Sequence, residues 1–131
     1  MMSVRDGVNK FVSVCFKASY NAGWWTDLKT GENLCAPENL KKYRIVQEKL
    51  CLIHSEVSEG LEGYRKNLMD DKLPHRTMLE VELADAMIRI GDLAGALDLD
   101  LGGAIEEKLA FNAVRPDHKV ENRAAEGGKA F

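Results

Sequence analysis

The sequence contains few cysteines and prolines, and no long apolar run. Its 131 residues include three cysteines and three prolines. Cys15, Cys35 and Cys51 are odd in number, far apart and without a Cys-x-x-Cys pairing, which favours reduced thiols in the cytoplasm over a disulfide framework. No run approaches the ~18 apolar residues that cross a membrane, and polar residues appear too early for a signal peptide. We therefore expect a cytoplasmic protein that does not span a membrane.

Neither sign of charge is in large excess. The chain has 18 Lys and Arg against 21 Asp and Glu, for a formal net charge of −3. This balance offers no basic surplus for a phosphate backbone, so duplex nucleic-acid binding is not expected, although a small anionic ligand remains allowed. The acidic excess is regional, because residues 48–92 alone carry a balance of −4.

Strand patterns are nearly absent, whereas apolar residues recur at steps of three and four, which predicts amphipathic helices. Four such helices bury their stripes most simply against one another, so the predicted fold is all-α, an antiparallel four-helix bundle. We expect one domain over residues 1–116 and a coil tail over residues 117–131. The expected helices span residues 4–20, 38–66, 77–98 and 101–115.

Local signals support two helix starts and one end. Thr77 followed by Glu80 has the spacing of a capping box, and Asp100 is expected to cap the last helix, which Pro116 ends. The predicted apolar stripes comprise Val46, Leu50, Ile53, Val57, Leu61 and Tyr64 in the second helix, and Leu79, Leu83, Ala86, Met87, Ile90, Ala94 and Leu97 in the third.

Two acidic pairs flank these stripes. They are Glu56-x-x-Glu59 and Glu82-x-x-Asp85, and residues three apart on a helix point in nearly the same direction. If the two helices pack antiparallel, four carboxylates converge and require protons or hard cations. Oxygen ligands favour Mg²⁺ or Mn²⁺ over zinc, and Mg²⁺ commonly bridges to substrate phosphates. The alternative, a solvated helix edge, stays open at this point.

A basic face follows in the fourth helix. Lys108, Asn112 and Arg115 lie at positions i, i+4 and i+7. Lys and Arg bind phosphate oxygens, and Asn bonds a phosphate or a base edge. The alternative is a solvated helix face on which these cations form ordinary ion pairs with Glu106 or Glu107.

The loop over residues 21–37 offers candidate base-binding groups. Trp24 or Trp25 could stack on a nucleobase, and Asn33 could bond its edge. Core packing for one tryptophan and turn formation for the asparagine are the alternatives.

Together these residues resemble a known family. The segments KLCLIHSEVSE from Lys49, ELADAMIRIGDLAG from Glu82, DLGGAIEEKLAFNAVRP from Asp100 and the terminal GGKAF are similar to the MazG-like all-α nucleoside triphosphate pyrophosphohydrolases, particularly their short phage and bacterial forms.

The resemblance implies hydrolysis of a nucleoside triphosphate between its α- and β-phosphates, with Mg²⁺ or Mn²⁺. The metal ligands of the family match, by position, Glu56, Glu59, Glu82 and Asp85. Glu59 is also expected to orient or deprotonate the attacking water. The basic face of Lys108, Asn112 and Arg115 matches triphosphate-binding positions. A homodimer or homotetramer is implied, in a bacterial cytoplasm or in that of a host cell if the chain is phage-encoded. The two tryptophans favour a purine such as dGTP or GTP.

Other functions fit the residues less well. A di-iron bundle requires Glu-x-x-His motifs, which are absent, and nothing around His54 singles it out as a phosphoacceptor. The remaining alternative is a non-catalytic helical module that binds nucleotides or regulates a partner.

Overall fold

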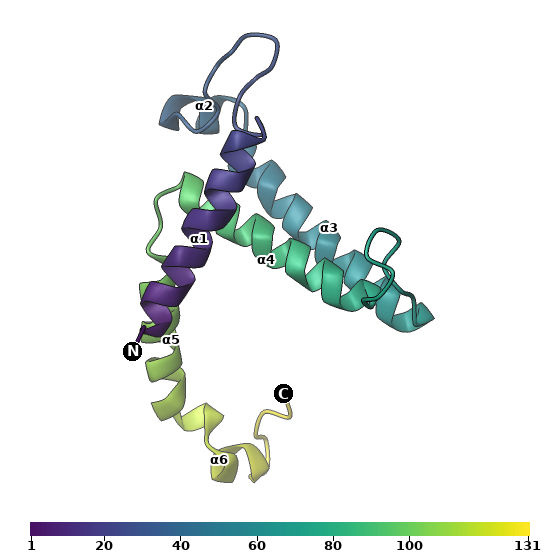
Figure 1. Cartoon of the computed structure of the whole chain (residues 1–131). Coiled ribbons are helices and arrows are strands. Elements are labelled where there is room, and N and C mark those ends of the chain that lie inside the picture. Colours follow the sequence, from purple (N-terminus) through teal and green to yellow (C-terminus); the bar gives the residue numbers. More distant parts are fainter. The chain divides into compact units, whose positions relative to one another are not determined.

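The computed structural model describes residues 1–131, which form an all-helical chain (Figure 1). No strand forms; there are only two isolated bridges, Thr26–Asn33 and Met69–Thr77. The all-α prediction is confirmed, while the bundle type stays a prediction. The elements are α1 (Val4–Asn21), α2 (Pro37–Lys42), α3 (Ile45–Lys66), α4 (Met78–Ala96), α5 (Leu101–Val114), the 3₁₀ turn η1 (Pro116–His118) and α6 (Val120–Ala124).

The chain divides into two units. The larger, Lys10–Leu99, holds most of α1 together with α2, α3 and α4. The smaller consists of Met1–Asn9 and Asp100–Phe131, and includes α5, η1 and α6. Each unit is described by itself, and the single catalytic domain expected over residues 1–116 stays a prediction.

Helices α3 and α4 form an antiparallel hairpin in which two glycines allow close approach. A Cβ atom on Gly63 would lie 2.7 Å from Met78 Cγ, and one on Gly60 would lie 3.4 Å from Glu82 Cβ. A larger residue at Gly63 would therefore push the two helices apart. The close approach brings the acidic pair of each helix to the same region of the hairpin.

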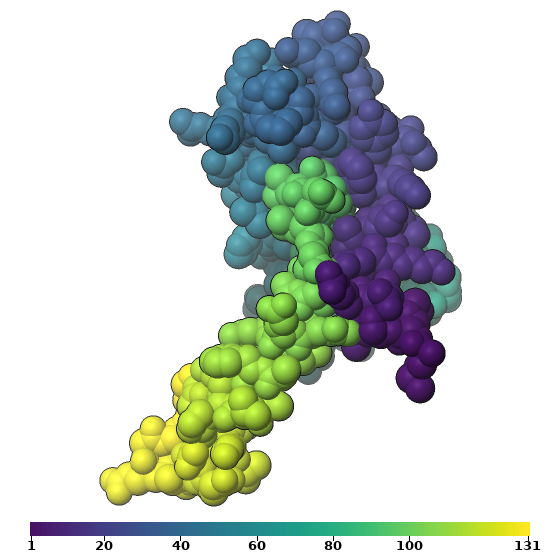
Figure 2. Space-filling view, turned by 90° about the vertical axis from the view of Figure 1, so that its left-hand side faces the viewer, coloured from purple at the N-terminus to yellow at the C-terminus, as the bar shows by residue number.

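Helix α1 crosses α4 over two further glycines. A Cβ atom on Gly91 would lie 3.1 Å from Cys15 Cβ, and one on Gly95 would meet Phe16. In the space-filling view, the loop after α1 and helix α2 gather at one end of the larger unit (Figure 2). The core lies at this end, where Trp25 is fully buried. It comprises the buried residues Trp25, Leu40, Ile45 and Leu93.

The helix expected over residues 38–66 is two helices, which corrects the prediction. Arg44 adopts a left-handed conformation with φ of 53° and separates α2 from α3. In one straight helix, Leu40 and Ile45 would point about 140° apart. The break allows both side chains to reach the core around Trp25.

The tail expected to be coil over residues 117–131 also differs from the prediction. It contains the end of η1 and helix α6, and Asn122 Nδ2 donates to the Pro116 carbonyl at 2.6 Å. The expected caps are confirmed. Thr77 Oγ1 accepts from Glu80 N at 3.2 Å, and Asp100 Oδ1 accepts from Gly103 N at 3.0 Å.

Much of the predicted apolar stripe on the hairpin is exposed. Since residues advance by about 100° along a helix, the exposed members fall on one side of each helix, and the antiparallel arrangement places both on the same side. We call this set the apolar face. It consists of Leu50, Val57, Leu61 and Tyr64 of α3, and of Leu83, Met87 and Ile90 of α4. None of the helices has an apolar stretch long enough to cross a lipid bilayer.

Candidate functional site

Three glutamates predicted as metal ligands converge on the hairpin. Carboxylate oxygens of Glu56 and Glu59 from α3 and of Glu82 from α4 all lie within 4.8 Å of one another. Glu56 is buried, Glu82 is half-buried and Glu59 is exposed. We call this group the glutamate cluster. It is buried at Glu56 and open to solvent at Glu59.

Asp85, the fourth predicted ligand, lies beside the glutamate cluster without belonging to it. It lines the same cavity, of about 600 Å³, together with the three glutamates. Asp71 and Lys72, from the loop between α3 and α4, line this cavity too. We call it the acidic cavity.

The carboxylates perturb one another's protonation. Burial, a hydrogen bond to Glu56 and the negative charge of Glu59 together raise the pKa of Glu82 to about 7. Its hydrogen bond with Glu56 and, secondarily, burial raise the pKa of Glu59. Burial and the charge of Glu56 also raise the pKa of Asp85. A cluster without enough positive charge retains protons in this way.

Glu56 behaves differently because a cation already contacts it. Arg89 Nε donates to Glu56 Oε1 at 2.6 Å. Burial alone would raise the pKa of Glu56, but the hydrogen bond from Arg89 and those from the Glu82 and Glu59 carboxyls lower it overall. Glu56 is thus the ionised member that the others surround. Arg89 does not belong to the acidic spacing pattern of the sequence, although its position four residues after Asp85 places it one turn along the same face.

The loop between the acidic helices is fixed by a buried aspartate. Asp70 Oδ2 accepts from the backbone N–H groups of Lys72 at 3.0 Å and Leu73 at 2.7 Å. Asp70 N in turn donates to the Arg76 carbonyl at 3.0 Å. These bonds hold the segment that carries Asp71 and Lys72 at the rim of the acidic cavity. The burial of Asp70 has no signal in the residue spacing of the sequence.

A second cavity adjoins the first. It has a volume of about 620 Å³, lies between α1, α3 and α4, and shares Glu56, Asp85 and Arg89 with the acidic cavity. We call it the groove. The other residues that line it are mainly small or apolar, and comprise Cys15, Ala18, Ser19, Ala22, Trp24, Lys49, Leu52, Ile88 and Asp92.

The two predicted base-binding tryptophans have different environments. Trp24 is 70% exposed and lines the groove. Trp25 is fully buried, packs edge-on against Phe16, and donates from Nε1 to Asp92 Oδ1 at 2.7 Å. The prediction is therefore corrected for Trp25, because a ring enclosed by the core offers no face to a base.

Asn33 is also used locally. Its Oδ1 accepts from Cys35 N at 2.9 Å, and its carbonyl accepts from Asn39 Nδ2 at 2.9 Å. Asn33 does not line the groove. The turn-forming alternative is therefore the role that its contacts show, and base binding by Asn33 stays a prediction.

The predicted phosphate-binding residues belong to the smaller unit. Arg115 Nε and Nη2 donate to the two oxygens of Asp117 at 3.0 and 2.7 Å, and its Nη1 lies 3.5 Å from Asn112 Oδ1. Lys108 is exposed, with its Nζ 4.9 Å from the Phe111 ring centroid. Neither Glu106 nor Glu107 pairs with these cations.

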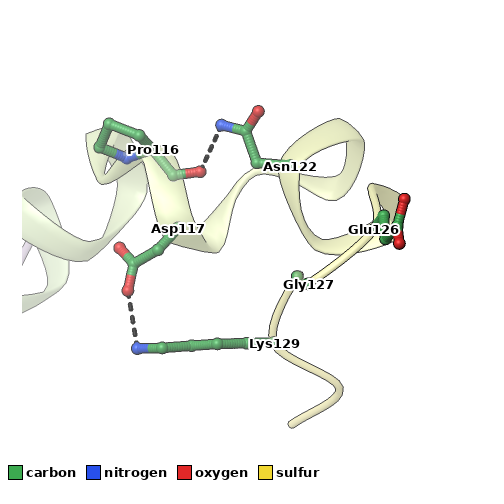
Figure 3. Close-up of a pocket in the computed structure, with 7 residues that line it drawn as sticks. Pro116, Asp117, Asn122, Glu126, Gly127 and Lys129 are labelled. Carbon is green, nitrogen blue, oxygen red and sulfur yellow. Dashed lines mark hydrogen bonds and ion pairs between the residues drawn. The ribbon is translucent and has the colours of Figure 1, made fainter.

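Asp117 links this basic face to the end of the chain. Lys129 Nζ pairs with Asp117 Oδ2 at 2.8 Å, across a pocket of about 390 Å³ that Asn122 and Glu126 also line (Figure 3). Hydrogen bonds from Arg115 and Lys129 hold the pKa of Asp117 well below its usual range. The Asp117 carboxylate therefore pairs with two cations of the smaller unit, Arg115 and Lys129.

No family model matches the chain, and no curated protein or solved structure matches it.

Proposed function

We propose that the chain is a metal-dependent nucleoside triphosphate pyrophosphohydrolase that cleaves between the α- and β-phosphates of a nucleoside triphosphate. The observation that carries the proposal is the convergence of Glu56, Glu59 and Glu82 oxygens within 4.8 Å, from two helices. The monophosphate and pyrophosphate are the products.

The residues of the acidic cavity fit a hard divalent cation. The carboxylates of Glu56, Glu59, Glu82 and Asp85 offer only oxygen donors, and the raised pKa values of the last three are those of acidic groups that repel one another. With Glu56, these residues would hold Mg²⁺ or Mn²⁺. When bound, such cations supply the positive charge that offsets that of the phosphate oxygens.

Glu59 is the proposed base. It is the most exposed member of the glutamate cluster, and its raised pKa suits a carboxylate that accepts a proton from water. It lines the acidic cavity. Glu59 would direct a water molecule at the α-phosphorus of the bound nucleotide.

The groove is the proposed nucleoside site. It adjoins the acidic cavity, is lined mainly by small and apolar residues, and carries the exposed ring of Trp24. A base stacked on Trp24 would leave the phosphates directed toward the carboxylates. The large indole surface supports the preference for a purine such as dGTP or GTP, in the cytoplasm where such nucleotides are found.

Lys108, Asn112 and Arg115 remain the proposed phosphate-binding residues. Arg115 already binds the two oxygens of Asp117 through two nitrogens, and a phosphate presents a similar pair of oxygens. Phosphate binding by Arg115 would therefore compete with Asp117.

We also propose a homo-oligomer, in which a second copy covers the apolar face. This face carries seven exposed apolar side chains on one side of the hairpin, while the carboxylates lie on the other. Two hairpins packed through these faces would make a four-helix bundle from two chains, with the acidic cavities left open.

A non-catalytic nucleotide-binding module is the second candidate. The observation that favours it is the Arg89–Glu56 pair, which gives the cavity a fixed cation without any metal. Such a module would bind nucleotides in the presence of a chelator and would not turn them over.

Pyrophosphate release from a panel of nucleoside triphosphates, with Mg²⁺, Mn²⁺ or a chelator, tests the proposal. Glu82→Gln should abolish turnover, whereas the matched exposed variant Glu48→Gln should leave it unchanged. Absence of turnover with every nucleotide at high protein concentration would exclude the enzyme. Nucleotide binding that persists in the chelator would then support the module.

A further inference from the structure

Arg89 occupies the junction of the two cavities. Glu56, Asp85 and Arg89 line both the acidic cavity and the groove, and Arg89 is the only cation among these shared residues. The remaining cations lie apart, with Lys49 in the groove and Lys72 in the acidic cavity. A ligand that extends from one cavity into the other can therefore contact Arg89.

The guanidinium retains donors for a ligand. Its Nε donates to Glu56, whereas neither of its terminal nitrogens donates a hydrogen bond to another residue of the chain. The Arg89 side chain is 39% exposed, so these terminal nitrogens can meet a bound anion. Arginine binds the paired oxygens of a phosphate through two N–H groups.

The chemistry of the two cavities indicates which phosphate would meet Arg89. The groove suits an uncharged nucleoside, whereas the acidic cavity suits cations and the charged chain of phosphates. A nucleotide that occupies both therefore has the phosphate attached to its sugar at the junction. Glu56 and Asp85 would repel this phosphate, so the position requires a fixed positive charge.

We propose that Arg89 binds the phosphate attached to the sugar, and so sets the position of the bond that the enzyme would cleave. The inference rests on the proposed function for its substrate class. It assigns to Arg89 a contact with substrate, in addition to its bond with Glu56. The same bond fixes the side chain before the ligand arrives, because Glu56 is buried.

Binding measurements by titration calorimetry, with Mg²⁺ present, test the proposal. The ligands are the four common deoxynucleoside monophosphates and the matching nucleosides, which lack the phosphate. Arg89→Gln should weaken monophosphate binding roughly 10- to 100-fold and leave nucleoside binding unchanged. Arg89→Lys keeps the positive charge but loses the paired N–H groups. Its affinity for the monophosphate should therefore lie between those of the wild type and of Arg89→Gln.

Arg76→Gln is the matched control. Arg76 also pairs with a glutamate, Glu80, at 3.0 Å, but it lines neither cavity. Its loss should not change monophosphate binding. Mn²⁺ affinity, measured by titration, should not fall in Arg89→Gln, since the change removes a competitor for Glu56.

The outcomes separate the inference from the proposed function. Monophosphate binding by Arg89→Gln equal to that of Arg76→Gln would overturn the inference, even if the wild-type protein turns over triphosphates. Equal losses for nucleoside and monophosphate, a parallel loss of Mn²⁺ affinity, or no monophosphate binding by the wild-type protein would overturn it too. A wild-type protein that binds monophosphates selectively through Arg89 but hydrolyses nothing would support the inference and refute the enzyme.

Discussion

Trp25 Nε1 donates a hydrogen bond to Asp92 Oδ1 at 2.7 Å in the core of the larger unit. The second oxygen of Asp92 accepts from Ser19 Oγ at 2.9 Å. A carboxylate that is 7% exposed is thereby satisfied by a side chain from α1 and one from the loop that follows. The bond ties the loop that carries Trp24 to α4, which lines the groove.

We predict that Trp25→Phe destabilises the protein, because it removes the donor to a buried carboxylate and reduces the core volume. The expected loss is about 2–4 kcal/mol in the free energy of unfolding. Trp24→Phe, at the exposed neighbouring position, should change it by less than about 0.5 kcal/mol. Urea denaturation followed by circular dichroism measures both, and equal effects would contradict the buried role of Trp25.

The raised pKa of Glu82 predicts a specific pH dependence of stability. Its pKa is about 7 in the folded chain against an ordinary 4.5, so the folded state binds more protons between these values. The effect of Glu82 on the free energy of unfolding is therefore absent at low pH. It becomes increasingly destabilising as the pH rises from about 4.5 to 7.

Unfolding free energies of the wild-type protein and Glu82→Gln, measured in a chelator across this range, isolate the effect. The variant should gain stability relative to the wild type as the pH rises. Mg²⁺ or Mn²⁺ should reduce the difference, since a cation replaces the retained proton. A difference that does not vary with pH would show that Glu82 titrates normally.

Glu59→Gln tests the proposed base. The variant keeps the size of the side chain and loses the ability to accept a proton, so kcat should fall roughly 10²- to 10⁴-fold. Nucleotide affinity should fall less than kcat, because three of the four proposed metal ligands are unchanged. Steady-state kinetics with pyrophosphate detection provide the measurement, and an unchanged kcat would assign the base to another residue.

The apolar face predicts the position of the subunit interface. A charge at Val57 or Met87, which are 52% and 59% exposed, should dissociate the oligomer. Analytical ultracentrifugation of Val57→Glu and Met87→Glu should show monomers, whereas Leu28→Glu, in the exposed loop, should behave as the wild type does. A wild-type protein that sediments as a monomer would refute the oligomer itself.

Release of Arg115 from Asp117 predicts tighter anion binding. Asp117→Asn removes the charge that both Arg115 and Lys129 neutralise. Pyrophosphate binding, measured by calorimetry at low salt, should strengthen severalfold, and Glu121→Gln should not reproduce the gain. If Asp117→Asn instead weakens binding, the carboxylate serves to position Arg115.

Helix periodicity was sufficient to predict most of the fold. It placed α1, α4 and α5 to within two residues at each end, and the caps at Thr77 and Asp100 were visible in the local sequence. The break at Arg44 was not, because an arginine in a left-handed conformation has no sequence signature. Packing of Leu40 and Ile45 around Trp25 decides that break, and such packing depends on residues distant in sequence.

The candidate site was predictable where it depends on helical spacing and not where it depends on the path of a loop. The i, i+3 spacing on two antiparallel helices identified Glu56, Glu59 and Glu82, since local geometry alone directs them to one region. The different environments of Trp24 and Trp25 depend on the path of an irregular loop. Arg89 could not be predicted from the spacing of carboxylates, although the same helical geometry places it one turn after Asp85.

The close approach at Gly63 has a consequence for the acidic pairs. A Cβ atom at this position would lie 2.7 Å from Met78 Cγ, so the first turn of α4 lies directly against α3. The distance between the two acidic helices near this end therefore depends on a side chain that is missing. Exchange of Gly63 for alanine would shift Glu82 relative to Glu56 without altering a single carboxylate.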